Sequence, residues 1–373
     1  MIENITSEIR NLLNIMEEKK ASDLHLKDGR PPMMRVDGIL KPLDMEPLTK
    51  ENARQLLDLL NEFQLERFEK NNSCDLSYEQ SDMSRYRVNI YRQRGSYGAV
   101  FRQIPIKIPT MQELLIPPVI KNILTMNQGL FLITGPTGSG KSTTLAGLIN
   151  EINENQDVHV ITVEDPIEFI FSDKRASITQ REIGIDCDSF EEALKVILRQ
   201  DPDIIVIGEM RDVETIKTAM TAAETGHLVF STLHTNDSTQ TIDRIIDIFP
   251  AAQQEQIRLQ LSLVLKGVIS QTLLTRKEGK GRIGAFEILL NSPNVQRLIL
   301  EGSTEQLFDE MESSVSYFRM QSMNQSLIAL YTHGFIAKEE ALSASSRTTE
   351  LDQFFIKDDV SSAIKTKEAD DFF

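Results

Sequence analysis

The sequence predicts an α/β fold in which a parallel sheet, covered on both faces, follows a smaller α+β domain. Three observations support this fold class. At 373 residues, the chain is longer than one hydrophobic core usually organises. From Gln128 to about Leu290, apolar runs of strand length alternate with helical patterns. Ahead of that region lies Ile104–Pro109, whose two prolines are typical of an extended connector.

The first domain, placed at residues 1–103, combines helical stretches with alternating strand patterns. Apolar side chains recur every three or four positions over residues 5–20, which predicts an amphipathic helix. A second helical stretch covers residues 48–71, with a break near Glu62. Five strands are expected, at Ala21–Leu26, Met33–Gly38, Asp75–Tyr78, Ser84–Arg92 and Gly98–Gln103. These elements predict a mostly antiparallel sheet.

After a linker over residues 104–118, the second domain covers residues 119–342. Its expected strands are Leu130–Thr134, His159–Glu164, Ile204–Glu209, Leu228–Leu233 and Ile283–Leu289. The first four are nearly all apolar, as in a parallel sheet buried on both faces. The last part of the domain, from Pro293, is predicted to be helical, with breaks near Gly302, Ser322 and Gly334.

Residues 343–373 are rich in Ser, Thr, Asp and Lys, so we expect a flexible acidic tail. The tail nevertheless contains four phenylalanines. Exposed aromatic side chains indicate docking on the body of the protein or on a partner. They are Phe354, Phe355, Phe372 and Phe373.

The bulk properties exclude several classes of protein. A net charge of −16 and a pI near 4.9 argue against a nucleic-acid partner. Cys74 and Cys187 are isolated, so neither a disulfide framework nor a four-cysteine zinc site is supported. No apolar run approaches the roughly 20 residues that span a bilayer, and the N-terminus lacks the pattern of a secretory signal. We expect a cytoplasmic protein that reaches a membrane through a partner.

Residues 135–143 fit the phosphate-loop template G-x-x-x-x-G-K-[ST]. An apolar strand pattern precedes them and a helical pattern follows, an arrangement that points a helix N-terminus at an anion. Lys141 is expected to reach the β- and γ-phosphates of a nucleoside triphosphate, and Ser142 to bind Mg²⁺. A chance glycine-rich turn is the alternative. The predicted nucleotide-binding residues are Gly135, Pro136, Thr137, Gly138, Ser139, Gly140, Lys141, Ser142 and Thr143.

Two carboxylates follow apolar strands at the edge where ligands bind in open α/β sheets. Glu164 begins an acidic cluster and is the candidate base that deprotonates the attacking water. Glu209 ends Ile204–Glu209 and is the second acidic group expected near Mg²⁺. The alternatives are a strand-end cluster that caps the next turn, for Glu164, and an ordinary exposed glutamate, for Glu209.

Histidines bracket the next apolar strand. His234 follows it and is the candidate sensor of a γ-phosphate, whereas His227 precedes it and is the weaker candidate. A structural histidine is the alternative. In the first domain, arginines suited to forked phosphate contacts recur along the expected strands, although a solvated strand face would have the same pattern. They are Arg85, Arg87, Arg92, Arg94 and Arg102.

Taken in order, these groups resemble the secretion and type IV pilus ATPase superfamily. Its four marks are the phosphate loop, an acidic box, a second acidic loop and a histidine box. The last three match Glu164–Glu168, Gly208–Asp212 and His227–His234. The segments Ala21–Leu26 and Pro31–Gly38, together with the lack of a four-cysteine zinc module, are similar to the pilus-retraction branch, PilT and PilU.

The resemblance implies a PAS-like first domain and a RecA-like P-loop NTPase core. It implies a homo-hexamer that hydrolyses ATP with Mg²⁺ to power type IV pilus retraction and twitching motility. The ring would work at the inner membrane through a pilus platform protein. Arginines of the first domain would reach the phosphates, and position by position the best matches are Arg87 and Arg102.

One segment departs from the family pattern. Where PilT members carry an Ala-Ile-Arg-Asn-Leu-Ile-Arg-Glu type of motif, this chain has Asn294–Glu301, in which only the Leu-Ile pair and the final Glu match. This difference favours a PilU-like protein that assists a paralogous retraction ATPase, with a PilT-like protein as the alternative. Two other functions stay open: a regulatory ring component that binds nucleotide but hydrolyses it weakly, and an extension or type II secretion ATPase.

Overall fold

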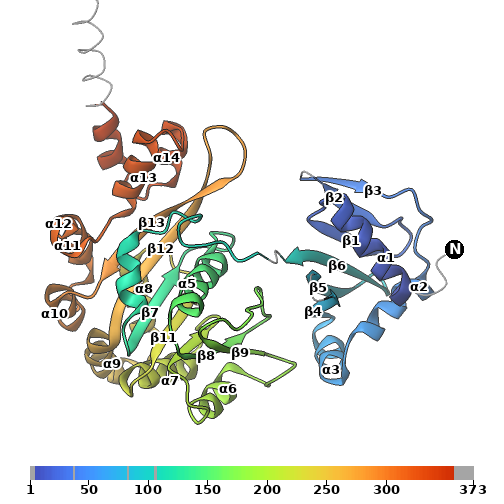
Figure 1. Ribbon diagram of the computed structural model, residues 1–373, viewed down its shortest axis with the longest axis horizontal. Helices are drawn as coiled ribbons and strands as arrows, with labels where there is room; N and C mark the ends of the chain where they lie inside the picture. Colours follow the sequence, from blue (N-terminus) through green and yellow to red (C-terminus); the bar gives the residue numbers. More distant parts are fainter. Residues whose placement is uncertain (1–4, 37, 82–83, 105–106, 357–373) are drawn as a thin grey trace, which may run out of the picture. The chain divides into compact units, whose positions relative to one another are not determined.

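The computed structural model describes residues 5–36, 38–81, 84–104 and 107–356 (Figure 1). The chain divides into two compact units. Unit 1 comprises Met1–Ile108 together with Val163–Ser172 and Gln180–Ala193. Unit 2 comprises Pro109–Thr162, Asp173–Thr179 and Leu194–Phe373. No helix among the described residues is long and apolar enough to cross a membrane.

The first sheet has the strand order β3-β2-β1-β6-β5-β4, and its neighbouring strands are antiparallel. Its strands are β1 (Asp23–Lys27), β2 (Met33–Val36), β3 (Ile39–Pro42), β4 (Ser73–Ser81), β5 (Ser84–Gln93) and β6 (Ser96–Ile104). The helical segments are α1 (Ile5–Glu18), α2 (Lys50–Arg54), η1 (Gln55–Leu59) and α3 (Glu62–Asn71). The expected antiparallel α+β arrangement is therefore confirmed, including the break near Glu62.

The second sheet has the strand order β13-β12-β7-β11-β10-β8-β9. These strands are β7 (Gly129–Thr134), β8 (His159–Glu164), β9 (Ser177–Glu182), β10 (Ile204–Ile207), β11 (Leu228–Leu233), β12 (Leu265–Thr275) and β13 (Arg282–Leu290). Strands β12, β7, β11 and β10 are mutually parallel, and β13 is antiparallel to β12. Every residue of β7, β10 and β11 is buried, which confirms that their apolar runs belong to a sheet covered on both faces.

Helices lie before and between the strands of this sheet, and further helices follow β13 (Figure 1). The connecting helices are η2 (Pro118–Ile120), α4 (Lys121–Leu124), α5 (Lys141–Asn155), α6 (Phe190–Ile197), α7 (Val213–Glu224), α8 (Ser238–Asp247) and α9 (Ala251–Val264). After β13 come α10 (Pro293–Glu301), η3 (Thr304–Gln306), α11 (Leu307–Ser313), α12 (Val315–Phe318), α13 (Met323–Thr332) and α14 (Lys338–Ala344). The expected breaks are confirmed: Gly302 ends α10 in the left-handed region, Ser322 caps α13, and Gly334 has a φ of 75°.

The sequence missed β3 in the first sheet, and in the second sheet it did not reveal two strands. Strand β12 begins at Leu265, directly after the last residue of α9, so no glycine or proline separates the helical period from the strand period. Strand β9 lies at the edge of the sheet and reads Ser-Ile-Thr-Gln-Arg-Glu, which lacks an apolar face. Both strands contribute residues to the candidate site.

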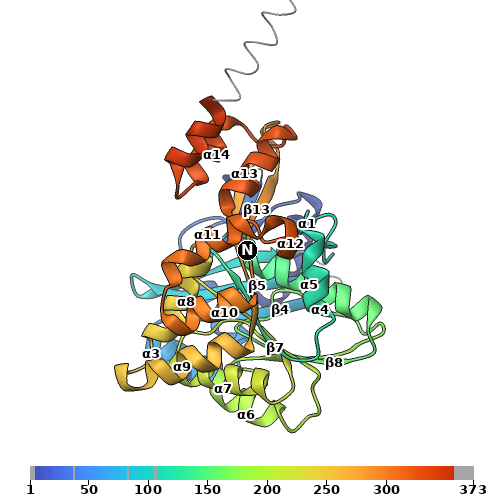
Figure 2. The same ribbon diagram turned by 90° about the vertical axis from the view of Figure 1, so that its left-hand side faces the viewer.

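The expectation of a flexible tail from residue 343 is wrong for its first part (Figure 2). Residues 348–356 are helical, and Leu351 and Phe355 are each 1% exposed. These two side chains are four positions apart, so they share one helix face. They pack in a cluster with Leu274 and Leu327. Phe372 and Phe373 lie outside the described residues.

Candidate functional site

The phosphate loop connects β7 to α5, as its sequence predicts. Gly135, Gly138 and Gly140 have φ values of 145°, 82° and 91°. A Cβ added to Gly135 would lie 2.3 Å from the carbonyl oxygen of Gln271, so both the backbone conformation and the close approach require glycine. The hydroxyl of Ser139 is buried without a hydrogen-bond partner among the described residues. The loop thus has the shape and a free polar group with which to meet a phosphate.

Lys141, the first residue of α5, is held against the loop. Its side-chain nitrogen donates to the carbonyl oxygens of Gly135, at 2.7 Å, and Pro136, at 3.2 Å. The residue is only 8% exposed. Its Nζ also lies 3.4 Å from Nδ1 of His234. The ammonium group is therefore held beside the phosphate loop.

Gln271 on β12 supports the loop. This role was not predicted from the sequence, because the strand that carries Gln271 was not recognised. Its Nε2 donates to the carbonyl oxygen of Ser139 at 2.6 Å, and the residue is 2% exposed. On the same strand, Ser270 accepts a hydrogen bond from Thr134 of β7 at 2.9 Å. Strand β12 thus fixes both the end of β7 and the loop that follows it.

Glu209 and His234 meet near Lys141, as expected from their positions after neighbouring strands. Glu209 comes two residues after β10, and His234 directly follows β11. Nε2 of His234 lies 3.2 Å from a carboxylate oxygen of Glu209. Arg211, a residue that the sequence reasoning passed over, pairs with the other oxygen. The result is a connected row of polar groups from the lysine of the phosphate loop to Arg211.

His227 does not belong to this row. It precedes β11, at the opposite end of the strand from His234. Its Nδ1 lies 3.0 Å from the carbonyl oxygen of Ala222. This contact ties the end of α7 to the start of the strand, so the structural alternative holds for His227.

Glu164 is the last residue of β8 and belongs to unit 1, as does Gln180. Gln180 of β9 donates to its carboxylate at 3.2 Å. The backbone of Ile183 donates to the carbonyl oxygen of Glu164 at 2.9 Å. The acidic box is therefore tied to β9, the second strand that the sequence did not reveal.

The arginines of the first domain pair with carboxylates. Nε of Arg102 donates to Asp23 at 2.8 Å, although 69% of the arginine side chain is exposed. Burial opposes ionisation of Asp23, but hydrogen bonds from Ser22 and Arg102 outweigh it and hold the pKa below its usual value. Arg87 is held more loosely, 3.8 Å from Asp75 and 3.9 Å from Glu168.

The three remaining arginines have other contacts. Arg85 is paired with the buried Glu182 at 2.8 Å, and its side chain is 12% exposed. Arg92 lies over the rings of Phe68 and Tyr97. Arg94 has a φ of 46° in the turn between β5 and β6. Of these three, Arg85 is the one whose guanidinium is held in an ion pair with a buried carboxylate.

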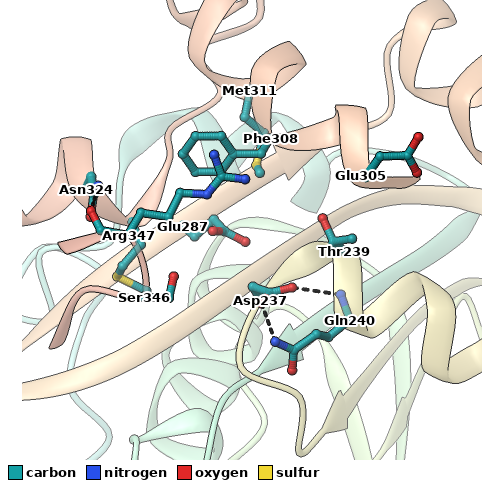
Figure 3. Close-up of a pocket in the computed structure, with 11 residues that line it drawn as sticks. Asp237, Thr239, Gln240, Glu287, Glu305, Phe308, Met311, Asn324, Ser346 and Arg347 are labelled. Atoms are coloured by element: carbon teal, nitrogen blue, oxygen red, sulfur yellow. Dashed lines mark hydrogen bonds between the residues drawn. The ribbon is translucent and has the colours of Figure 1, made fainter. Parts of the chain in front are cut away.

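A cavity of about 320 Å³ lies in unit 2, beside the segment that follows His234 (Figure 3). Asp237 lines it and caps α8 by accepting from the backbone of Gln240 at 2.7 Å. Burial raises the pKa of Glu287 in its wall, although hydrogen bonds from Ser238 oppose the shift. The guanidinium of Arg347 lies 3.4 Å from the centre of the Phe308 ring. The C-terminal segment therefore packs against α11 in the wall of this cavity.

The site offers oxygen ligands of the kind that Mg²⁺ binds. Within the described residues, no group of three or more His, Cys, Asp or Glu side chains is placed to hold a metal ion by itself. A site of one hydroxyl, one carboxylate, water and substrate phosphates needs no such group. Ser142 and Glu209 provide that hydroxyl and that carboxylate, so the residues fit the ion.

Sequence comparisons show which proteins this chain is similar to. Residues 112–341 match the family model described as type II/IV secretion system protein. The type IV pilus retraction ATPase PilT of Pseudomonas aeruginosa is 45% identical, over 90% of this chain and 97% of that protein. The type IV pilus ATPase PilU of the same organism is 42% identical, over 92% of this chain and 90% of that protein.

Structural comparisons agree. A crystal structure of the pilus retraction motor PilT with bound ADP matches with a TM-score of 0.85 and 44% identity, covering 92% of this chain and 99% of that one. The ATPase DotB of Legionella pneumophila matches with a TM-score of 0.80 and 27% identity, covering 90% and 94% of the two chains. The two-domain α/β fold is therefore shared across nearly the whole length of these ATPases.

Proposed function

This chain belongs to the PilT/PilU family of type IV pilus ATPases, and we propose from this premise that it is the motor that hydrolyses ATP to retract a pilus. The observation that carries the proposal is the connected row of Lys141, His234 and Glu209 at the phosphate loop. Such a row joins the group that binds a phosphate to groups that respond to its presence.

In the proposed mechanism, Gly135–Thr143 bind the phosphates through backbone N–H groups, and Lys141 moves from the loop carbonyls to the β- and γ-phosphates. Ser142 and Glu209 would hold Mg²⁺, and the ion would supply positive charge that neutralises the phosphates. Glu164 accepts the proton of the attacking water. His234 changes its hydrogen bonds when the γ-phosphate leaves.

Arg87 and Arg102 complete the site in this proposal. They would contact the phosphates from a neighbouring subunit of a homo-hexamer. Support comes from their exposure, because Arg102 can leave Asp23 without stranding it. Asp23 keeps a hydrogen bond from Ser22 at 2.7 Å and an ion pair with Arg35 at 3.7 Å. Exchange of carboxylate for phosphate would then couple hydrolysis to movement of the first domain, residues 1–103.

We further propose that the ring acts at the inner membrane, on a pilus platform protein, together with a paralogous retraction ATPase. The altered segment Asn294–Glu301, now placed in α10, favours a PilU-like accessory role. The identities to PilT and PilU are too similar to decide between the two subtypes.

Surface pili and motility in deletion and complemented strains, with and without the paralogous ATPase, test the proposal. Loss of retraction leaves excess surface pili and abolishes twitching, whereas loss of an extension ATPase leaves no pili. Complementation with Glu164→Gln should fail to restore motility, although the purified variant still binds ADP. Full motility with this variant would contradict the mechanism.

A regulatory ring is the second candidate, because the altered α10 segment leaves it open. Purified protein at saturating ATP distinguishes the two. Phosphate release near background would favour the regulatory function, and sustained turnover would favour the motor.

A further inference from the structure

Strand β9 presents two polar side chains on its inner face. Ile178, Gln180 and Glu182 alternate with more exposed residues along the strand, so they share one face. Glu182 is only 3% exposed. A carboxylate that is so deeply buried needs hydrogen-bond or ion-pair partners. The contacts of Gln180 and Glu182 show which segments these two side chains hold to β9.

The amide of Gln180 is fixed at both ends. Its Oε1 accepts from the backbone of Phe171 at 2.9 Å, and its Nε2 donates to the carbonyl oxygen of Phe169 at 2.8 Å. The same Nε2 donates to the carboxylate of Glu164 at 3.2 Å. Because the backbone contacts set the orientation of the amide, the hydrogen bond to Glu164 has a fixed direction.

Glu182 collects contacts from three segments of unit 1. One of its oxygens accepts from the backbone of Ile167 at 3.1 Å, from Ser77 at 2.9 Å and from Arg85 at 2.8 Å. Ile167 lies within the acidic box, Ser77 on β4 and Arg85 on β5. The acidic box is therefore held at two points by β9, and the second point is shared with the sheet of the first domain.

We propose that Gln180 and Glu182 are positioning residues for hydrolysis: Gln180 orients Glu164, and the Glu182–Arg85 pair links the acidic box to the sheet of the first domain. The inference rests on the proposed role of Glu164 as the base. It gives Arg85 a different task from Arg87 and Arg102, because a buried arginine that satisfies a buried carboxylate is not available to a phosphate.

Gln180→Ala in the purified full chain is the first test. It should lower kcat for ATP hydrolysis about 10-fold, because a displaced base loses its alignment with the attacking water. KM and ADP affinity should stay at the parent values, since phosphate binding depends on the loop. Tm should fall, because the backbone groups of Phe169 and Phe171 lose their partner. Thr179→Ala is the matched control. Its hydroxyl lies 3.2 Å from the ring of His159, away from Glu164, so kcat should not change.

A double-mutant cycle tests the second link. Arg85→Ala removes the paired cation from the buried Glu182 carboxylate, which keeps the hydrogen bonds from Ser77 and Ile167, and should lower kcat about 10-fold. Adding Glu182→Gln removes that charge and should cost nothing further. Arg85→Lys keeps the charge and should recover most of the rate. Additive losses, or equal losses in Tm and ADP affinity, would assign both residues to stability alone and overturn the inference.

The two proposals fail in different ways. If Glu164→Gln hydrolyses ATP at the parent rate, the role of Glu164 is wrong and the inference falls with it. If Glu164→Gln is inactive while Gln180→Ala turns over normally, the positioning inference is wrong and the proposed function stands.

Discussion

The phosphate loop and the arginines of the first domain differ in how firmly the chain holds them. Lys141 is 8% exposed and bound to two loop carbonyls, with Gln271 fixing the loop from β12. Arg102 reaches its partner with 69% of its side chain exposed. The loop is a preformed region, whereas Arg102 is exchangeable. Its guanidinium is exposed, and the buried Asp23 keeps a hydrogen bond from Ser22 and an ion pair with Arg35 when the arginine leaves.

We therefore expect substitutions in the two regions to have different effects on nucleotide binding and turnover. Changes in the preformed region should remove binding, because the loop has no other way to hold a phosphate. Changes to the exchangeable arginines should leave binding intact and slow turnover, because in the proposed mechanism they contact phosphate only when the first domain moves.

Lys141→Ala should have the largest effect. We expect ATP hydrolysis and ADP affinity each to fall about 100-fold or more, since a charge that meets the β- and γ-phosphates is lost. ADP titration and phosphate release measure the two losses. Lys121→Ala is the control, because that lysine pairs with Glu151 on the protein surface. An ADP affinity of Lys141→Ala within threefold of the parent value would contradict the expectation that the loop, unlike the arginines, determines nucleotide binding.

Arg102→Ala should lower kcat about 10- to 100-fold, in the range seen when one stabilising donor is removed. ADP affinity should change by less than about threefold, or about 0.7 kcal/mol. Steady-state kinetics combined with ADP titration separate the two quantities. Arg92→Ala is the matched control on the same sheet, because its guanidinium pairs with Glu69 and lies over the Phe68 ring. An equal loss of kcat in both variants would remove any special role for Arg102.

The sequence predicted the residues whose position follows from a local pattern. The phosphate loop, Glu164 and Glu209 each follow an apolar strand, and parallel strands bring such ends to one edge of a sheet. Gln271 was missed because α9 passes into β12 without a break, so the strand that carries it could not be recognised. Gln180 was missed because a polar edge strand lacks an apolar face.

Pairings across the first sheet were also beyond the sequence. Asp23 and Arg102 face each other because β1 and β6 pair in a register that joins residues 79 positions apart. A shift of that register by one residue would place the two side chains on opposite faces. The arginines could therefore be named as candidates from the resemblance, but their carboxylate partners could not.

Gln271→Ala tests how much the hydrogen bond from β12 contributes to nucleotide binding by the preformed region. Loss of the amide leaves the Ser139 carbonyl unpaired, which costs about 1–3 kcal/mol and loosens the loop. We expect ADP affinity to fall about 10-fold, with kcat at saturating ATP less affected. Isothermal titration measures the change. Ser270→Ala removes hydroxyl contacts with Thr134, Ser238 and Glu287 but none with the phosphate loop, so it should leave affinity nearly unchanged. A loss equal to that of Gln271→Ala would mean that β12 acts as a whole.

Glu287→Gln tests the smallest effect, the stability of the cavity wall next to the histidine box. Burial raises the pKa of Glu287 in the folded chain, so both states are protonated below about pH 4.3 and no penalty exists there. As pH rises, the unfolded chain releases the proton first, and the free energy of unfolding of the parent falls until the raised pKa is passed. Gln has no proton to lose.

The advantage of Glu287→Gln over the parent should therefore grow as pH rises from 4.5 to 7.5, measured from urea unfolding midpoints. The variant amide oxygen can still accept from Ser238, whose backbone and hydroxyl each donate at 2.8 Å. Glu305→Gln removes the same charge from the exposed rim of the cavity and so reports the effect of net charge alone. An advantage that does not change with pH would mean that Glu287 is ionised in the folded chain, with its charge satisfied by Ser238.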